Sequence, residues 1–183
     1  MVFIFGFDGI IANTSFSVES ALHRANLNFA EKQEHLSVLF DGSPDSTLKK
    51  AFFSQTEKEP EESFSTVKQF FLSWFYEHCL EQTVLLQGVA DFLYSLSVKG
   101  SKILLVSAWP EKITQKIIRY FDIDGYFDSI FYNGKLEGIE KFLSDQQVTA
   151  VLKNSAEVQA IKALSCRSLT IFPDFNAVKI LVK

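Results

Sequence analysis

The sequence predicts an α/β protein with a parallel sheet and an inserted helical segment, and two features of its pattern indicate this class. From Val89 onward, short apolar runs that suit buried strands alternate with stretches of helical periodicity, which is typical of βαβ units. Before them, a long helical block follows the first apolar run, Val2–Phe5. We therefore expect an α/β core over residues 1–13 and 85–183 and a helical insertion over residues 14–84.

The composition suits a folded chain with a large core and excludes some partners. The 183 residues carry a formal net charge of −4, and 19 of them are phenylalanine. Because neutralising phosphates needs a basic face, we expect no nucleic-acid partner. Cys79 and Cys166 give neither a disulfide framework nor a metal-ligand spacing, so we expect reduced thiols. No apolar run approaches the roughly 18–20 residues that cross a bilayer, and no basic leader precedes a cleavage site, so we expect a cytoplasmic protein without membrane partners.

The elements of the insertion follow from caps, turns and periodicity. Asp8, Gly9 and Asn13 mark a loop after the first strand. Periodicity then predicts helices that begin after a cap at Thr14 or Ser15 and continue as Glu31–Phe40, about Ser46–Phe53, and Ser63–Gln82. The last helix carries aromatic residues on more than one face, which suits either packing against the core or a partner surface: Phe64, Phe70, Phe71, Trp74 and Phe75.

The alternating part of the chain predicts the remaining elements. The expected helices are Val89–Val98, Glu111–Tyr120, Leu136–Leu143 and Ala156–Leu164. The expected strands are Lys102–Val106, Ser129–Tyr132, Val148–Leu152 and Leu169–Phe172. The apolar end of the chain is compatible with a further edge strand. Open α/β sheets bind ligands at the carboxyl ends of their strands, so we expect the helical insertion to close over that edge.

Two stretches of the chain resemble the haloacid dehalogenase (HAD) superfamily of phosphohydrolases, in its phosphoglycolate-phosphatase-like branch. Residues 85–131 carry a Gly-Val pair, a helix ending in Leu and Gly, an apolar strand ending in Ser, a further helix and a Tyr-Phe-Asp turn. Residues 3–14, FIFGFDGIIANT, resemble the first motif of that family, an apolar strand running into Asp-x-Asp-Gly-Thr. The resemblance implies a Rossmann-like core with a helical cap inserted after this motif.

The resemblance also implies a chemistry, which is phosphoryl transfer through an aspartyl intermediate. In that family the first Asp attacks phosphorus, and the second protonates the leaving oxygen and later activates water. A Ser or Thr and a Lys hold phosphate oxygens. Acidic residues after a later strand hold Mg²⁺ together with the nucleophile, because Mg²⁺ prefers hard oxygen ligands.

This sequence departs from the family pattern at the nucleophile, where Gly6 stands. Asp8 matches the second carboxylate and is the catalytic candidate, and its alternative role is to cap nearby loop amides. Ile10 replaces the usual Thr. Ser107 matches the second motif, where its hydroxyl would bind an anion or cap the following helix.

The lysine and metal motifs are also altered. Lys135 is the candidate for the anion-binding lysine, with Lys141 as the alternative. Lys153 stands where the metal-binding Asp is expected, and Glu157 stands where the second acid is expected. One close charge pair is worth roughly 4 kcal/mol at an effective dielectric of ~20, so this exchange should largely abolish Mg²⁺ affinity. We expect no metal site, and we expect the Lys153 ammonium to pair with Asp8 or with a bound anion.

The sequence thus predicts a degenerate member of the superfamily that has lost the aspartyl mechanism and needs no cofactor. It would bind a small phosphorylated or otherwise anionic ligand at Ser107, Lys135 and Lys153, or a protein partner through the cap. The alternative is an active phosphatase in which Asp8 activates water for direct attack, and Mg²⁺ is expected only in that case. A third hypothesis is a structural or regulatory subunit without a small-molecule ligand.

Overall fold

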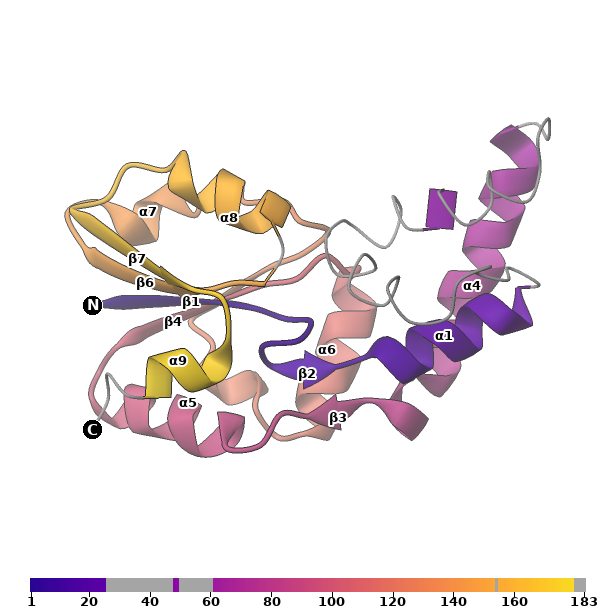
Figure 1. Cartoon of the computed structure of the whole chain (residues 1–183), viewed down its shortest axis with the longest axis horizontal. Coiled ribbons are helices and arrows are strands. Elements are labelled where there is room, and N and C mark those ends of the chain that lie inside the picture. Colours follow the sequence, from indigo (N-terminus) through magenta and orange to yellow (C-terminus); the bar gives the residue numbers. More distant parts are fainter. Residues whose placement is uncertain (26–47, 50–60, 154, 180–183) are drawn as a thin grey trace.

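A central parallel sheet organises the chain, as shown by a computed structural model that describes residues 1–25, 48–49, 61–153 and 155–179. The strand order is β5-β4-β1-β6-β7, and every neighbouring pair is parallel (Figure 1). The strands are β1 (Val2–Gly6), β4 (Lys102–Val106), β5 (Ser129–Phe131), β6 (Gln147–Val151) and β7 (Ser168–Phe172). The predicted α/β class and its parallel sheet are confirmed.

Helices cover both faces of this sheet (Figure 1). On one face lie α7 (Glu140–Leu143) and α8 (Ser155–Lys162). On the other lie α5 (Val89–Val98), α6 (Glu111–Tyr120), the short 3₁₀ helix η1 (Asp124–Tyr126) and α9 (Phe175–Lys179). Within the described ranges, none of the helices is both long and apolar enough to cross a membrane.

One sequence prediction in this part of the chain is wrong in detail, and one helix was not predicted. The helix expected over Leu136–Leu143 begins only at Glu140, because Gly138 has a left-handed conformation with φ of 80° that interrupts the helix. After Asp174 the chain forms helix α9, which the sequence did not predict, and the apolar end over residues 180–183 lies outside the described residues. The Asp174 carboxylate accepts the backbone N–H of Ala177 at 2.9 Å, which caps that helix.

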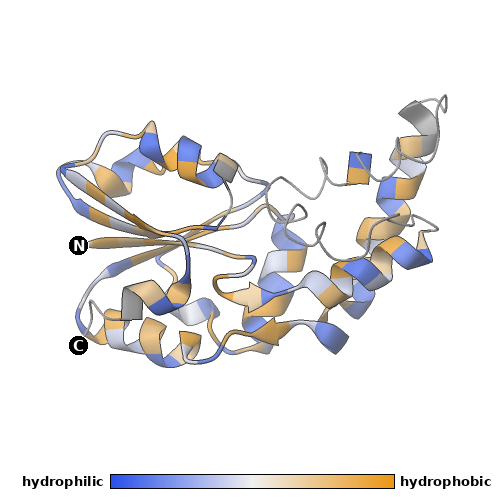
Figure 2. Cartoon of the chain, in the orientation of Figure 1, coloured by the Kyte–Doolittle hydropathy of each residue, from blue (hydrophilic) through white to orange (hydrophobic). Residues whose placement is uncertain are grey.

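The core lies on both faces of the sheet because side chains alternate along each strand. Phe3 and Phe5 of β1 point to the face of α5 and α6, whereas Val2 and Ile4 point to the face of α7 and α8. Phe92 of α5 packs edge-on against Phe3 and Phe5, with ring centroids 6.5 and 6.1 Å apart. Figure 2 shows β1 in hydrophobic colours. Because this central strand is buried on both faces, its sequence is a continuous apolar run.

A pair of helices stands beside the carboxyl edge of the sheet (Figure 1). They are α1 (Ser15–Arg24) and α4 (Glu61–Gln82), and we call them the helical pair. A short antiparallel ribbon of β2 (Ala12–Asn13) and β3 (Val84–Leu85) leads the chain into and out of this part. The helix expected over Glu31–Phe40 lies outside the described residues.

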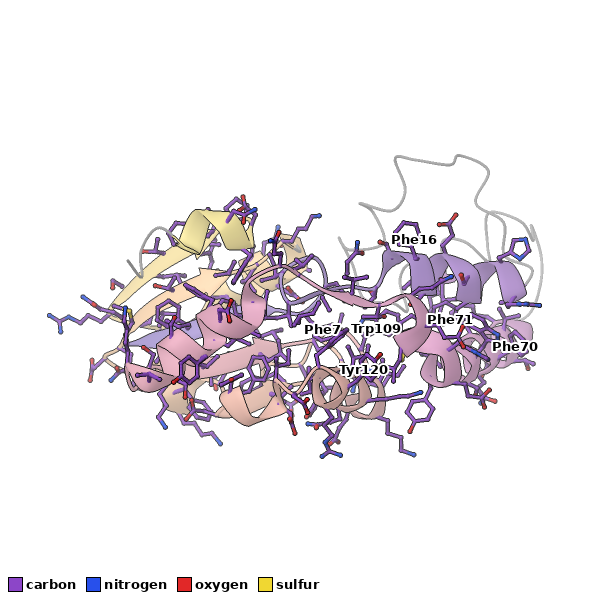
Figure 3. The ribbon with its side chains drawn as sticks, turned by 90° about the horizontal axis from the view of Figure 1, so that it is seen from below. Phe7, Phe16, Phe70, Phe71, Trp109 and Tyr120 are labelled. Atoms are coloured by element: carbon purple, nitrogen blue, oxygen red, sulfur yellow. The ribbon has the colours of Figure 1, made fainter. Side chains whose placement is uncertain are left out.

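The aromatic residues of α4 face in two directions, and the partner surface that the sequence left open stays a prediction. Phe71 and Phe75 are buried in the main core, whereas Phe70 is 50% exposed on the helical pair (Figure 3). Cys79 of the same helix is buried, and both it and Cys166 are free thiols, as expected. The stripe therefore joins the helical pair to the core on one side and faces outward on the other.

Candidate functional site

The predicted site residues come from loops at one edge of the sheet. Gly6, the last residue of β1, is in register with Val106 of β4, and Phe5 is in register with Val151 of β6. Asp8, Ser107 and Lys153 therefore follow the carboxyl ends of three adjacent strands. Ligands of open α/β sheets bind at this edge, and β1 lies at its centre.

The loop after β1 is a tight turn that places Asp8. The Gly9 N–H donates to the Ala12 carbonyl at 2.8 Å, and the Ile11 N–H donates to the Phe7 carbonyl at 2.9 Å. Gly9 has a φ of 70°, which favours glycine because it has no β-carbon. This closed turn holds the Asp8 backbone directly beyond the strand.

Both carboxylate oxygens of Asp8 are hydrogen-bonded by side chains. The Thr14 hydroxyl donates to Oδ1 at 2.5 Å, and the Trp109 indole Nε1 donates to Oδ2 at 2.9 Å. Burial raises the pKa of Asp8 to about 6, although these two hydrogen bonds favour the ionised form and lower it. The alternative role considered for Asp8, capping loop amides, is replaced by bonds to side chains.

Trp109 joins the sheet edge to the helical pair. Its indole stacks on Phe75 of α4 with ring centroids 4.2 Å apart and an angle of 8° between the planes, and Phe71 lies 6.4 Å away (Figure 3). The residue is buried, so the ring fills the space between Asp8 and α4. The sequence analysis missed this residue, and its only signal was a bulky aromatic two positions after Ser107.

The space of the missing nucleophile is filled from α8. A β-carbon at Gly6 would lie 3.0 Å from Glu157 Oε2 and 3.5 Å from Leu152 Cδ2. Burial and, as the smaller cause, the negative charge of Asp8 raise the pKa of Glu157 to about 8. A carboxyl group therefore reaches the end of β1 from the first turn of α8, although β1 itself carries none there.

Lys153 lies over the turn that carries Asp8. A β-carbon at Gly9 would lie 3.0 Å from Lys153 Cδ and 3.5 Å from its Nζ. The hydrogen bonds described above reach Asp8 from Thr14 and Trp109, so the pairing that we expected between Lys153 and Asp8 stays a prediction. The exposed Lys153 side chain thus lies on the rim of the site.

The Ser107 hydroxyl is engaged within the protein. It shares a hydrogen bond of 2.8 Å with the Thr114 hydroxyl and accepts the backbone N–H of Trp109 at 3.2 Å. Ser107 is fully buried. Ser107 does not cap α6, whose N-cap is Pro110 and has no side-chain cap bond, and anion binding by Ser107 stays a prediction.

The loop of Lys135 meets the same edge. The Gly134 N–H donates to the Ser107 carbonyl at 2.9 Å, which ties the turn after β5 to the end of β4. The Lys135 side chain is exposed, whereas the Lys141 ammonium lies 5.0 Å from the centroid of the Phe142 ring on α7. The contact between the neighbouring Gly134 and Ser107 places Lys135 next to this edge, and its role as an anion-binding lysine stays a prediction.

The donor set does not fit Mg²⁺, which the fold family implies. Of the described site residues considered above, Asp8 and Glu157 carry carboxyl groups. Gly6 and Lys153 replace two acidic positions. In the described part of the chain, no group of three or more His, Cys, Asp or Glu side chains is placed to hold a metal ion.

The sheet, its central strand β1 and the acidic turn beyond it define a Rossmann-type α/β protein with its site at the carboxyl edge. The chain belongs to the haloacid dehalogenase-like hydrolase family, whose sequence pattern matches residues 3–150. The predicted membership of the HAD superfamily is therefore confirmed. A comparison with curated protein sequences finds no significant match.

Solved structures share this fold. A predicted phosphoglycolate phosphatase from Haemophilus somnus is 23% identical with a TM-score of 0.79, over 100% of this chain and 97% of that chain. The β-phosphoglucomutase of Clostridium difficile is 16% identical with a TM-score of 0.71, over 99% and 96%. CbbY from Rhodobacter sphaeroides, solved in complex with phosphate, is 14% identical with a TM-score of 0.69, over 93% and 85%. At these identities the likeness concerns the fold alone.

Proposed function

We propose that this member of the HAD-like hydrolase family does not transfer phosphate through an aspartyl intermediate and acts by binding a protein partner. The observation that carries the proposal is the filled position at the end of β1. Gly6 offers no carboxylate to phosphorus, and a β-carbon there would lie 3.0 Å from Glu157 Oε2. The remaining family carboxylate, Asp8, is held by Thr14 and Trp109.

The contacts at the sheet edge favour a protein partner over a small anionic ligand at Ser107, Lys135 and Lys153. An anion there would need the Ser107 hydroxyl, which is buried and already bonded to Thr114 and to the Trp109 N–H. It would also compete with the indole of Trp109 for the space beside Asp8. A partner that docks on the outer surface requires none of these bonds to break.

The test is hydrolysis of p-nitrophenyl phosphate in excess Mg²⁺ by the unchanged chain and by Asp8→Asn. We expect both to match the buffer blank and neither to form an acyl phosphate. Asp91→Asn, at an exposed position on α5, is the matched control. Turnover that Asp8→Asn abolishes and Asp91→Asn preserves would overturn the proposal.

One observation favours a second function, metal-free hydrolysis in which Asp8 activates water. The pKa of Asp8, raised by burial to about 6, lies in the range where a carboxylate can accept a proton near neutral pH. The bonds from Thr14 and Trp109 weigh against it, because both oxygens already accept protein donors. Its signature would be a hydrolysis rate that rises with pH through about 6 and survives EDTA.

A further inference from the structure

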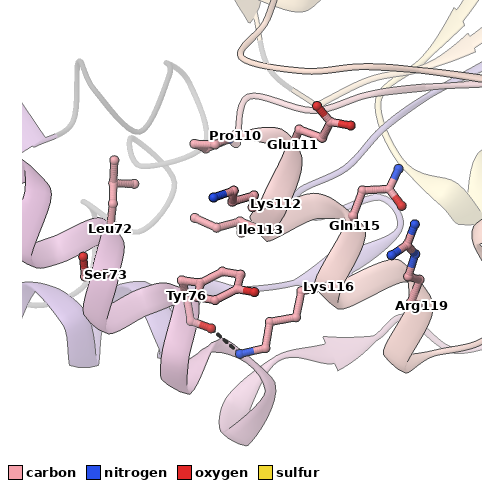
Figure 4. A pocket seen from close by; sticks show the side chains of 10 residues that line it. All are labelled: Leu72, Ser73, Tyr76, Pro110, Glu111, Lys112, Ile113, Gln115, Lys116 and Arg119. Atoms are coloured by element: carbon pink, nitrogen blue, oxygen red, sulfur yellow. Dashed lines mark hydrogen bonds between the residues drawn. The ribbon is translucent and has the colours of Figure 1, made fainter.

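We infer that a groove between α4 and α6 binds an acidic, extended segment of a partner protein. The inference rests on the proposed binding function and assigns its surface and the chemistry of the partner. The groove has a volume of about 990 Å³ (Figure 4). Tyr76 and Leu72 line it from α4, and Lys112, Lys116 and Arg119 line it from α6. An occupant would therefore contact the helical pair and the sheet-bearing part together.

The charges along the groove favour an acidic partner. Lys112, Lys116 and Arg119 follow at intervals of four and three residues, so they lie along one face of α6. Against these cations, the described lining of the groove holds one carboxylate, that of Glu111. The whole chain has a net charge of −4, so this basic strip runs counter to the overall charge. Such a local patch recognises a partner of opposite charge.

Lys112 and Arg119, at the two ends of the strip, are the side chains placed to pair with a ligand. Lys116 already ties the helices together, since its ammonium donates to the carbonyls of Tyr76 and Glu77 and lies 4.6 Å from the Tyr76 ring centroid. Arg119 Nε lies 3.8 Å from Asp124 Oδ2, and an exposed pair at this distance holds the guanidinium weakly. Lys112 is exposed on the first turn of α6.

The spacing of these cations suits an extended ligand. Lys112 and Arg119 are about 10 Å apart along the helix axis at 1.5 Å per residue, so a ligand that lies along the helix can place one acidic group at each of them. An extended chain rises about 3.3 Å per residue, so three or four of its residues span that distance. Leu72 of α4 and Pro110 before α6 also line the groove and are half-buried, which suits an apolar side chain in the ligand beside the acidic ones.

The test uses the full chain and a short fluorescein-labelled peptide of glutamate and leucine, with fluorescence anisotropy as the readout. We expect saturable binding that weakens as salt is added, and a loss of about tenfold or more in Lys112→Glu/Arg119→Glu. The matched control Lys162→Glu/Arg167→Glu reverses one exposed lysine and one exposed arginine on the other side of the sheet, and it should bind like the unchanged chain. Circular dichroism checks that each variant is folded.

Three results would overturn this assignment. They are no binding of the peptide by the unchanged chain, equal binding by Lys112→Glu/Arg119→Glu, and equally tight binding of a single-stranded DNA of the same charge. The last would mean that the groove accepts any polyanion. The phosphatase test remains separate from this one. If the chain neither turns over phosphate nor binds the peptide, only the assignment of the groove is rejected. If it shows turnover that depends on Asp8, the proposed function itself is rejected.

Discussion

Asp8 and Glu157 approach each other at the end of β1, and the charge of one affects the titration of the other. Burial raises the pKa of Asp8 to about 6 and that of Glu157 to about 8, and the charge of Asp8 contributes to the second shift. Near neutral pH the pair therefore carries about one negative charge, on Asp8, with Glu157 protonated. The misfit with Mg²⁺ comes instead from Gly6 and Lys153, which stand where the family pattern has acidic residues.

This pair makes stability depend on pH. A carboxyl group whose pKa rises on folding gives stability that is fully present below its unfolded pKa and is lost as pH rises through its folded pKa. For Glu157 the window runs from 4.5 to about 8. We expect the free energy of unfolding to fall across this window, and to fall less in Glu157→Gln, as measured by urea titrations at several pH values. An unchanged pH dependence in Glu157→Gln would show that the pKa of Glu157 is ordinary.

The indole of Trp109 is the second decisive side chain. Trp109→Phe keeps a ring against Phe75 but removes the donor to Asp8, so we expect a loss of about 1–3 kcal/mol in the free energy of unfolding. Trp109→Ala also opens a cavity, with an expected loss of about 3–5 kcal/mol. Tyr94→Ala, at a side chain that is 59% exposed, is the control and should lie within about 0.5 kcal/mol of the unchanged chain. Guanidinium denaturation measures all three, and similar losses in Trp109→Ala and Tyr94→Ala would contradict the role of the indole.

At the scale of elements, the turn between β1 and β2 positions the site. Its backbone hydrogen bonds join residues that are three to five positions apart, and the Lys153 side chain lies next to Gly9. The turn also feeds the short ribbon of β2 and β3, which leads to the helical pair. Its geometry therefore sets both the place of Asp8 and the path of the chain into α1.

Glycine is required in this turn at position 9. Gly9→Ala places a β-carbon at a φ of 70°, which costs roughly 1–2 kcal/mol, and 3.0 Å from Lys153 Cδ, which must move. Gly125→Ala is the matched control, since a β-carbon there meets nothing within 4 Å and its φ is not positive. We expect thermal unfolding at a clearly lower temperature for Gly9→Ala and almost no change for Gly125→Ala. Equal melting temperatures would show that the turn adapts without strain.

At the scale of the whole molecule, the helical pair and the sheet meet through side chains from distant parts of the chain. Trp109 stacks on Phe75, and the Lys116 ammonium donates to carbonyls of α4. These contacts lie beside the same sheet edge as Asp8 and Ser107. The junction that holds the two parts together thus occupies the place where other members of such folds admit a ligand.

Restoring the two lost acids tests whether the remaining architecture can still hold a metal. In Gly6→Asp/Lys153→Asp we expect Mg²⁺ to raise the melting temperature, because a ligand at 100 times its Kd stabilises the folded state by about 2.7 kcal/mol. The unchanged chain should respond to MgCl₂ only as it does to NaCl of equal ionic strength. Gly6→Asp alone is the control, since it retains Lys153. If Mg²⁺ stabilised the unchanged chain, that result would contradict the conclusion that its residues do not fit the metal.

Local signals predicted most of the fold and part of the site. The strands β1, β4 and β6 were readable because apolar runs between Gly and polar residues have few other uses in a soluble chain. Helix α9 could not be predicted, because five residues are too few to show a periodicity. The hydrogen bond from Trp109 to Asp8 could not be predicted either, because it joins positions 101 residues apart.

By itself, the sequence determined that this chain has the family's fold and no carboxylate at position 6, since an apolar pattern and the identity of a residue are local facts. Only the tertiary structure decided that Glu157 fills that position, that Trp109 covers Asp8, and that three cations of α6 face a groove beside α4. These features depend on distances between segments far apart in the chain, and such distances exist only after the sheet and the helices have packed.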